Sequence, residues 1–130
     1  MVIVWVNGCF DVLHRGHFEL LEYARSLGDR LVVGIDVDNR VRQYKGKGRP
    51  YNTQEDRKYA LECLRAVDEV VTFKSNGHMK GMLGRSKAEI IVVGSDWKGK
   101  YVVGQEMVKE VRFFDRIGDY STTKILEGMK

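Results

Sequence analysis

Five short runs of apolar and β-branched residues, separated by polar and glycine-containing segments, most constrain how this chain can fold. Residues 2–6, 30–35 and 89–94 read VIVWV, RLVVGI and EIIVVG, and two further runs cover 69–73 and 110–114. Continuous apolar runs of this length are typical of strands that are buried on both faces. Because helical segments fall between them, we expect βαβ units that build a parallel sheet.

Segments with apolar residues at helical spacing separate the strands. The expected helices and helical turns cover 17–27, 53–67, 78–86, 104–109 and a short last segment capped by Ser121 or Thr122. Gly28 is expected to stop the first helix, and Thr53 to cap the second. The polar, glycine-rich residues 36–52 are expected to form a long loop. The pattern predicts an α/β fold, a Rossmann-like parallel five-stranded sheet with helices on both faces, as a single domain over 1–130.

The basic residues of the chain concentrate in one place. The 130 residues carry 22 Lys and Arg against 18 Asp and Glu, a net charge of +4. Residues 40–49 hold five of these cations and no acid, so the rest of the chain has 17 cations against 18 anions. A surface that coats nucleic acid would be basic over a wide area. The distribution therefore favours a local anion-binding loop and no nucleic-acid partner.

Membrane and secreted classes are disfavoured by the sequence. The longest uninterrupted apolar runs are far too short to cross a bilayer. The first residues, MVIVWVNG, lack the charged region and the length of a secretory signal. The two cysteines, Cys9 and Cys63, lie in different expected elements and form no CxxC pair, which is typical of a reducing compartment. We expect a cytoplasmic protein without a membrane partner.

Polar and glycine-containing segments follow the expected strands. Ligands of open parallel sheets bind beyond the carboxyl ends of the strands, at the point where the strand order reverses. Functional residues are therefore expected in segments 8–17, 36–49, 94–100 and 115–123.

The segment GCFDVLHRGH, residues 8–17, joins the first strand to the first helix. A helix start offers free N–H groups and a positive dipole end, and His14 and His17 at i, i+3 can reach one phosphate group together. Gly16 between them leaves room for a ligand. A zinc site of both histidines with Cys9 and Asp11 is the alternative. It is disfavoured, because the cysteine falls across a turn and no second ligand cluster follows, and we expect no protein-bound metal.

GCFDVLHRGH resembles the HxGH signature of the nucleotidyltransferase superfamily, in its cytidylyltransferase-like family. Such enzymes join a nucleoside triphosphate to a phosphorylated small molecule and release pyrophosphate. The resemblance implies that His14 and His17 are catalytic, by contacting the triphosphate and stabilising the transition state. The nucleotide-binding residues that the motifs indicate are Gly8, Cys9, Phe10, Asp11, Gly16, Gly94, Asp96, Trp97, Ser121 and Thr122.

The basic loop KGKGRP, residues 45–50, resembles the adenylyltransferase half of the heptose-phosphate enzymes. The resemblance implies that Lys45 or Lys47 is a catalytic lysine that binds phosphate. Arg57 and Arg65 match arginines of the following helix in the family. We assign both, with Asp36, to binding of the phosphorylated acceptor.

Two later segments resemble another branch of the family, the glycerol-3-phosphate cytidylyltransferases. GSDWKGK at 94–100 is similar to their GxDW-x-GK segment, and RIGDYSTTK at 116–124 to their RTEGISTT signature. The second match implies that Arg116 joins the catalytic residues and that Ser121 and Thr122 hold the triphosphate. RTEG has become RIGD here, which moves a glycine that lies near the base in the family.

The motifs together predict transfer of CMP from CTP to glycerol 3-phosphate. The alternative is an adenylyl- or cytidylyltransferase that acts on a sugar phosphate such as heptose 1-phosphate. The expected cofactor is Mg²⁺ held mainly through nucleotide phosphates, and the resemblance implies a homodimer. Competing classes are a nucleotide-binding regulatory module without turnover and a nucleic-acid-binding protein that uses the basic residues of 40–49.

Overall fold

The computed structural model describes residues 1–115 and 121–128. Five strands form one sheet: β1 (Ile3–Gly8), β2 (Arg30–Asp36), β3 (Glu69–Phe73), β4 (Ile90–Gly94) and β5 (Glu110–Phe114). Their order in the sheet is β3-β2-β1-β4-β5, and all four pairings are parallel. The expected Rossmann-like parallel sheet is confirmed, and the order reverses between β1 and β4.

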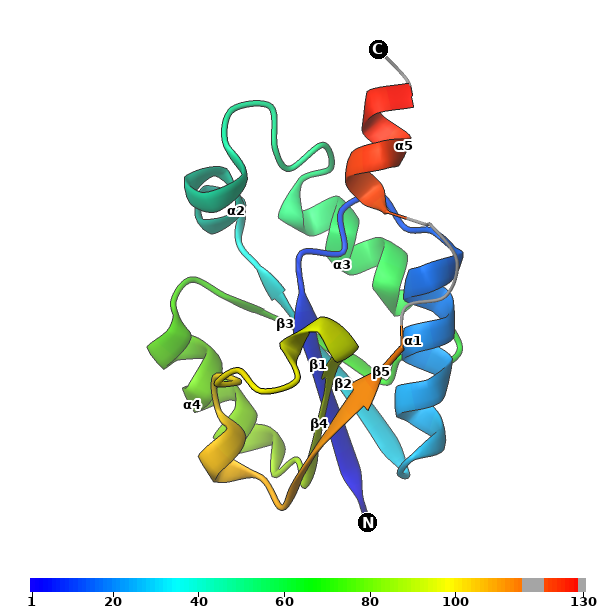
Figure 1. Cartoon of the computed structure of the whole chain (residues 1–130), viewed down its shortest axis with the longest axis vertical. Coiled ribbons are helices and arrows are strands. Elements are labelled where there is room, and N and C mark those ends of the chain that lie inside the picture. The colour runs from blue at the N-terminus through cyan, green and yellow to red at the C-terminus, as the bar shows by residue number, and fades with distance from the viewer. Residues whose placement is uncertain (116–120, 129–130) are drawn as a thin grey trace.

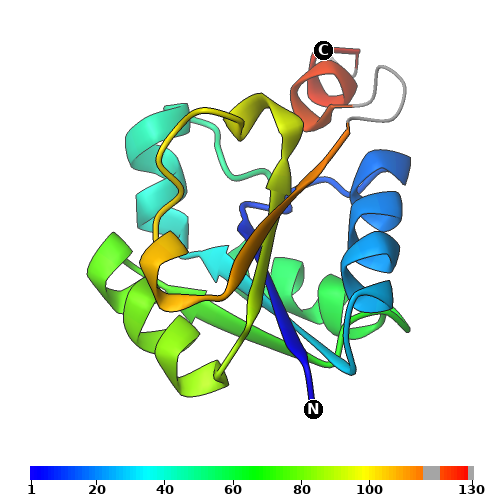
Figure 2. The same cartoon turned by 60° about the horizontal axis from the view of Figure 1, so that its bottom comes forward.

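Alternate strand residues point into two apolar layers. Val4, Val6 and Val33 pack with α1 (Arg15–Ser26) and α3 (Gln54–Glu62) on one face. Trp5 and Val32 pack with α4 (Asn76–Ser86) on the other. Figure 2 shows α1 and α4 on opposite sides of the sheet. This period of two lets one continuous apolar run supply both layers.

Gly34 of β2 makes room for the largest residue of the second layer. A Cβ atom at Gly34 would lie 2.6 Å from the Trp5 ring, so any larger residue would displace the indole. The Trp5 indole is fully buried and donates from Nε1 to Asn7 Oδ1 at 3.0 Å. This bond satisfies the one polar atom of the indole, as a buried tryptophan requires.

The segment 36–52 is not the long loop that its composition predicts, because it contains helix α2 (Asp38–Lys45). Only Val41 of this helix is buried, so the sequence shows no apolar stripe. Tertiary contacts hold its start: Asp38 accepts from Arg57, and its N–H donates to Gln54. Lys45 therefore stands at the end of a helix, and only 46–53 connects α2 to α3.

The boundaries of two other helices differ from expectation. α1 begins at Arg15, earlier than predicted, because His14 caps it. α3 ends at Glu62 and not at Val67, since Leu64 and Val67 form tighter turns whose N–H groups bond three residues back. Thr53 caps α3 as expected, by accepting from Asp56 N at 3.2 Å.

Helix α5 (Thr122–Gly128) and two 3₁₀ turns, η1 (Ser95–Trp97) and η2 (Gln105–Met107), complete the described chain. Ser121 caps α5 by accepting from Lys124 N at 3.0 Å. In Figure 1 the strands run upward, and α2, η1 and α5 lie toward their carboxyl ends. Within the described residues, no helix combines the length and apolarity needed to cross a membrane.

Candidate active site

The turn from β1 into α1 presents two imidazoles to one cavity. His14 and His17 have ring centroids 3.9 Å apart, and both line a cavity of about 440 Å³, here called the histidine cavity. Its other polar and charged lining residues are Lys45, Ser95, Asp96, Ser121, Thr122 and Thr123. All four predicted segments therefore contribute residues to one cavity, the fourth through Ser121, Thr122 and Thr123.

The two histidines fix each other and the helix start. His14 Nδ1 accepts from Gly16 N at 3.1 Å, and His17 Nδ1 accepts from His14 N at 3.2 Å, which is a reciprocal capping box. A nitrogen that accepts a hydrogen bond carries no proton, so each neutral ring is protonated on Nε2. Each ring thereby has an Nε2–H donor on the edge opposite the backbone, which suits an anion.

Burial, together with the nearby His14 and Lys45, lowers the pKa of His17 from 6.5 to about 4. His17 is therefore a neutral donor at pH 7. An oxyanion near the ring acts in the opposite direction, because an opposite charge favours the protonated form. The pair can thus receive negative charge that develops on a phosphate.

Phe10 and Gly8 shape the turn that precedes the histidines. Phe10 has φ +50°, a strained value for a residue with a side chain, and its buried ring lies 5.3 Å from the His17 ring centroid. A Cβ at Gly8 would come within 3.1 Å of the Phe10 ring. The structure therefore packs Phe10 against His17, and Phe10 lines none of the three cavities described here. Cys9 and Gly8 line a second cavity, described below, and burial raises the pKa of the Cys9 thiol.

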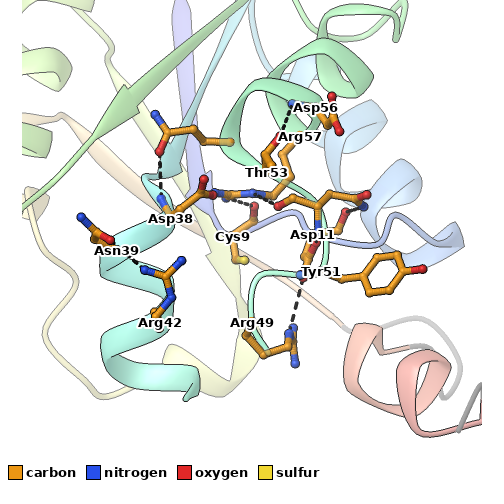
Figure 3. A network of polar contacts seen from close by, with 12 residues as sticks. Cys9, Asp11, Asp38, Asn39, Arg42, Arg49, Tyr51, Thr53, Asp56 and Arg57 are labelled. Atoms are coloured by element: carbon orange, nitrogen blue, oxygen red, sulfur yellow. Dashed lines mark hydrogen bonds and ion pairs between the residues drawn. The ribbon is translucent and has the colours of Figure 1, made fainter. Parts of the chain in front are cut away.

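Asp11 ties the basic loop to this turn. Its buried carboxylate accepts from Tyr51 N at 2.6 Å and Asn52 N at 2.8 Å, and it lies 3.4 Å from Arg49 Nε. Figure 3 shows Asp11 and Arg49 on either side of Tyr51. Asp11 lines none of the three cavities described here, so its contacts make it a support for the loop.

Arg57 and Arg65, which the motifs grouped together, have different environments. The Arg57 side chain is 0% exposed and donates to Cys9 O, Asn52 O and Asp38 Oδ1 at 2.9, 3.1 and 2.8 Å. It joins the β1 turn, the basic loop and the start of α2 (Figure 3). Arg65 is 89% exposed and pairs with Glu22 on α1. Neither lines the three cavities described here, and their assignment to acceptor binding stays a prediction.

Lys45 and Lys47 are separated by the structure. Lys45 lines the histidine cavity and both other cavities, whereas Lys47 lines only a cavity of about 490 Å³, the basic cavity, with Arg49, Tyr51 and Thr123. Gly46 and Gly48 have φ near +90°, conformations that favour glycine and turn the loop between them. Lys45 is the better placed of the two lysines for a phosphate that meets the histidines.

Arg49 is a basic residue that the motif assignments did not single out. Its Nε and Nη2 atoms are buried without a hydrogen-bond partner in the part of the chain that the structure describes, although Nε lies near Asp11. Its Nη1 reaches Thr123 Oγ1 at 3.5 Å. The guanidinium lines the basic cavity beside Lys45 and Lys47, so it adds positive charge that suits an anion. The loop's glycine and lysine content indicated an anion site, but only burial distinguishes Arg49.

Gly94, Asp96 and Trp97 bring the fourth strand into the site. A Cβ at Gly94 would lie 2.7 Å from Asp96 Oδ1, so glycine lets this carboxylate fold back over the chain. Asp96 lines the histidine cavity, whereas Trp97 lines the second cavity. Thr122 donates to Val12 O at 2.8 Å, which joins the start of α5 to the HxGH turn. Arg116 lies outside the described residues.

The described residues contain no group of three or more His, Cys, Asp or Glu that could hold a metal ion. Of the acidic side chains in the described part, only Asp96 lines the histidine cavity. Mg²⁺ usually takes one or two carboxylates together with substrate phosphates. Asp96 therefore fits an ion held mainly by phosphate oxygens.

Comparisons with known proteins agree with this geometry. Residues 5–128 match the family described as Cytidylyltransferase-like, and the chain belongs to that family. It is 47% identical to the bifunctional protein HldE of Nitratiruptor sp. and 45% identical to that of Campylobacter concisus, over 98% of this chain in each case. It covers 28% and 27% of those proteins, so it spans about a quarter of their length.

Solved structures give the same fold. A lipopolysaccharide core biosynthesis protein from Thermoplasma volcanium superposes with a TM-score of 0.72 and 28% identity, over 93% of this chain and 99% of that one. Pantothenate synthetase from Thermus thermophilus has a TM-score of 0.64 at 17% identity, over 96% of this chain and 61% of that one, which supports the fold alone. The chain is therefore a nucleotidyltransferase-family protein with a Rossmann-like fold.

Proposed function

We propose that this chain transfers the adenylyl group of ATP to heptose 1-phosphate and releases pyrophosphate. The observation that carries nucleotidyl transfer is that His14 and His17 line one cavity with Lys45 while the Nδ1 atom of each ring accepts from the backbone. The choice of substrates is supported by the HldE relatives and by the KGKGRP loop, which resembles the adenylyltransferase half of the heptose-phosphate enzymes.

In the reaction, an oxygen of the acceptor phosphate attacks the α-phosphorus of ATP. The bond from the α-phosphorus to the oxygen that bridges to the β-phosphorus breaks, and pyrophosphate leaves with that bond's electrons. The acceptor is already an anionic nucleophile at neutral pH, so no strong general base is required. Catalysis then depends on alignment and on neutralising phosphate charge.

The chain's own residues supply these two requirements. His14 and His17 donate to oxygens of the α- and β-phosphates, and Lys45 adds a positive charge beside them. Lys47 and Arg49 hold the leaving phosphates in the basic cavity. Ser121 and Thr122 face the triphosphate at the start of α5. Mg²⁺ bound to the phosphates next to Asp96 would neutralise further charge.

The competing assignment is CTP with glycerol 3-phosphate, the substrate pair that the sequence motifs together predict. It is favoured by the GSDWKGK and STTK segments, but the HldE relatives support the sugar-phosphate alternative better. A pyrophosphate-release assay separates the two. ATP, CTP, GTP and UTP are each combined with heptose 1-phosphate, glycerol 3-phosphate, phosphocholine and phosphoethanolamine.

We expect ATP with heptose 1-phosphate to give the highest kcat/KM. Faster release from CTP with glycerol 3-phosphate would replace the proposed substrates but retain the reaction. Release from no combination would reject nucleotidyl transfer and favour the regulatory module. If instead the protein binds nucleic acid through its basic loop, its affinity for DNA or RNA should fall steeply with salt.

A further inference from the structure

A second cavity adjoins the histidine cavity at the carboxyl end of the sheet. It has a volume of about 510 Å³, within the range of small-molecule sites, and we call it the carboxylate cavity after Asp36. The two cavities share Leu20, Lys45 and Gly94. A molecule bound in the carboxylate cavity can therefore extend to the phosphates that meet the histidines.

One part of its lining is a connected polar cluster from β2, α2 and α4. The buried Asp36 carboxylate accepts from Arg40 Nε at 2.7 Å and bonds the Tyr44 hydroxyl. Arg40 Nη2 donates to Asn76 Oδ1 at 2.6 Å, and its guanidinium lies over the Phe73 ring. A carboxylate offers about four lone-pair sites and a guanidinium five N–H donors. The cluster can therefore accept from and donate to neighbouring hydroxyls at the same time.

Another part of the lining is apolar and aromatic. Trp97 lines this cavity together with Val102 and Val103, and its side chain is 46% exposed. An exposed indole at a cavity rim offers a flat face to a ligand. A ring that carries hydroxyls on its edges and C–H groups on its faces matches both parts of the lining.

The charges of the three cavities assign them to the three groups around the α-phosphorus. Among the described residues, Lys45 alone lines all three cavities, so the reacting phosphate is placed at Lys45. The basic cavity has three cations, Lys45, Lys47 and Arg49, against one carboxylate, Glu127, and suits the leaving phosphates. The histidine cavity, with Phe114 and Ser95, suits the nucleoside and the α-phosphate. In the carboxylate cavity the Asp36 charge is paired with Arg40, so the lining offers hydrogen-bonding groups that suit hydroxyls better than a triphosphate. The carboxylate cavity is then left for the acceptor.

We propose that the carboxylate cavity binds the sugar ring of the acceptor, that Asp36, Arg40 and Asn76 select it through its hydroxyls, and that Trp97 packs on its face. The inference rests on the proposed function, which makes the acceptor a phosphorylated sugar whose phosphate reacts at Lys45. It adds the residues that determine specificity for the polyhydroxylated ring. A site built to bond hydroxyls rejects an analogue that lacks them, because its polar groups are then left unpaired.

The test compares Asn76→Ala with Asn39→Ala in the full chain. Both asparagines are exposed and accept from an arginine of α2, Asn76 from Arg40 and Asn39 from Arg42, but only Asn76 lines the cavity. We expect Asn76→Ala to raise the KM for heptose 1-phosphate at least tenfold and to change the KM for ATP less than twofold. Asn39→Ala should match the wild type in both.

Trp97 gives a second comparison. Trp97→Ala should raise the KM for heptose 1-phosphate in the same way, and Trp97→Phe should restore most of it by returning an aromatic face. A rise in the KM for ATP in the Asn76 and Trp97 variants would show that the nucleoside occupies this cavity, and unchanged constants would show that neither substrate does. Either result overturns the proposal while the proposed reaction stands.

Calorimetric titration with heptose 1-phosphate covers the case in which the wild type releases no pyrophosphate from ATP with this acceptor. The proposed function has then failed, and the titration decides the inference separately. Binding to the wild type that is lost in Asn76→Ala and retained in Asn39→Ala supports the ring site. No binding to the wild type overturns it.

Discussion

Replacing Arg57 with Met tests whether this arginine holds the site together or binds a substrate. The substitution keeps an unbranched side chain of similar reach but removes three donors. Their partners, Cys9 O, Asn52 O and Asp38 Oδ1, come from three segments that meet at Arg57. The side chain is fully buried, so water cannot replace the guanidinium without disturbing the packing.

The expected cost follows from these contacts. Removing one partner of a buried ion pair costs about 3–5 kcal/mol. The Asp38 side chain is 27% exposed and can be partly hydrated after the change, which favours the lower end, about 3 kcal/mol. With a urea m-value of about 1.5 kcal/mol/M, the unfolding midpoint should fall by about 2 M.

The assay is urea unfolding followed by circular dichroism, with Arg65→Met as the matched control. Arg65 is a solvent-exposed arginine whose ion pair with Glu22 joins surface side chains, so its loss should leave the midpoint unchanged. The reasoning is refuted if Arg57→Met unfolds at the wild-type midpoint and instead raises the KM for the acceptor. That result would return Arg57 to the substrate-binding role that the motif match implies.

Two further predictions concern the HxGH turn and the loop that it supports. The folded-state pKa of His17, about 4, lies below its unfolded value of 6.5, so its stabilising contribution is present above pH 6.5 and lost as the pH falls toward 4. The free energy of unfolding, measured with urea at both pH values, should be roughly 2–3 kcal/mol lower at pH 4 than at pH 7 because of this residue. His17→Gln, which keeps an acceptor for the capping box, should remove that part of the pH dependence of the unfolding free energy. An unchanged pH dependence would contradict the lowered pKa of His17. Asp11→Ala should cost about 3 kcal/mol, because it removes the acceptor of the part-buried Tyr51 and Asn52 N–H groups and the ion-pair partner of Arg49. A melting temperature within 2 °C of the wild type, on the order of 0.5 kcal/mol, would contradict that role.

The sheet could be predicted from the sequence because β1, β2 and β4 contain continuous apolar runs, and β3 and β5 are short segments rich in β-branched and aromatic residues. Helix α2 could not, because it buries only Val41 and owes its start to Arg57 and Gln54, which lie farther along the chain. Its polar composition is equally typical of a loop. A helix held by distant polar contacts leaves no periodic signal in its own residues.

The candidate site could be predicted to the level of its segments but not of its side chains. The HxGH and STTK motifs could be assigned to one site, because ligands of parallel sheets bind beyond the carboxyl ends of the strands. Both motifs line the histidine cavity. Arg57 and Arg65 are the same residue type in one segment, and only the structure shows that the first is buried and the second exposed. Asp96 and Trp97 are adjacent in the sequence, yet they line different cavities.

The most direct test of the central claim compares turnover with ATP binding in His14→Asn and His17→Gln. Asparagine retains a capping acceptor at the helix start, and glutamine retains the return bond to the cap, so the variants remove the imidazole donors with little effect on α1. The account predicts that kcat for pyrophosphate release falls about 10²- to 10³-fold, while the Kd for ATP changes less than threefold. A matched loss of ATP affinity with unchanged kcat would contradict a role for the histidines in the transition state.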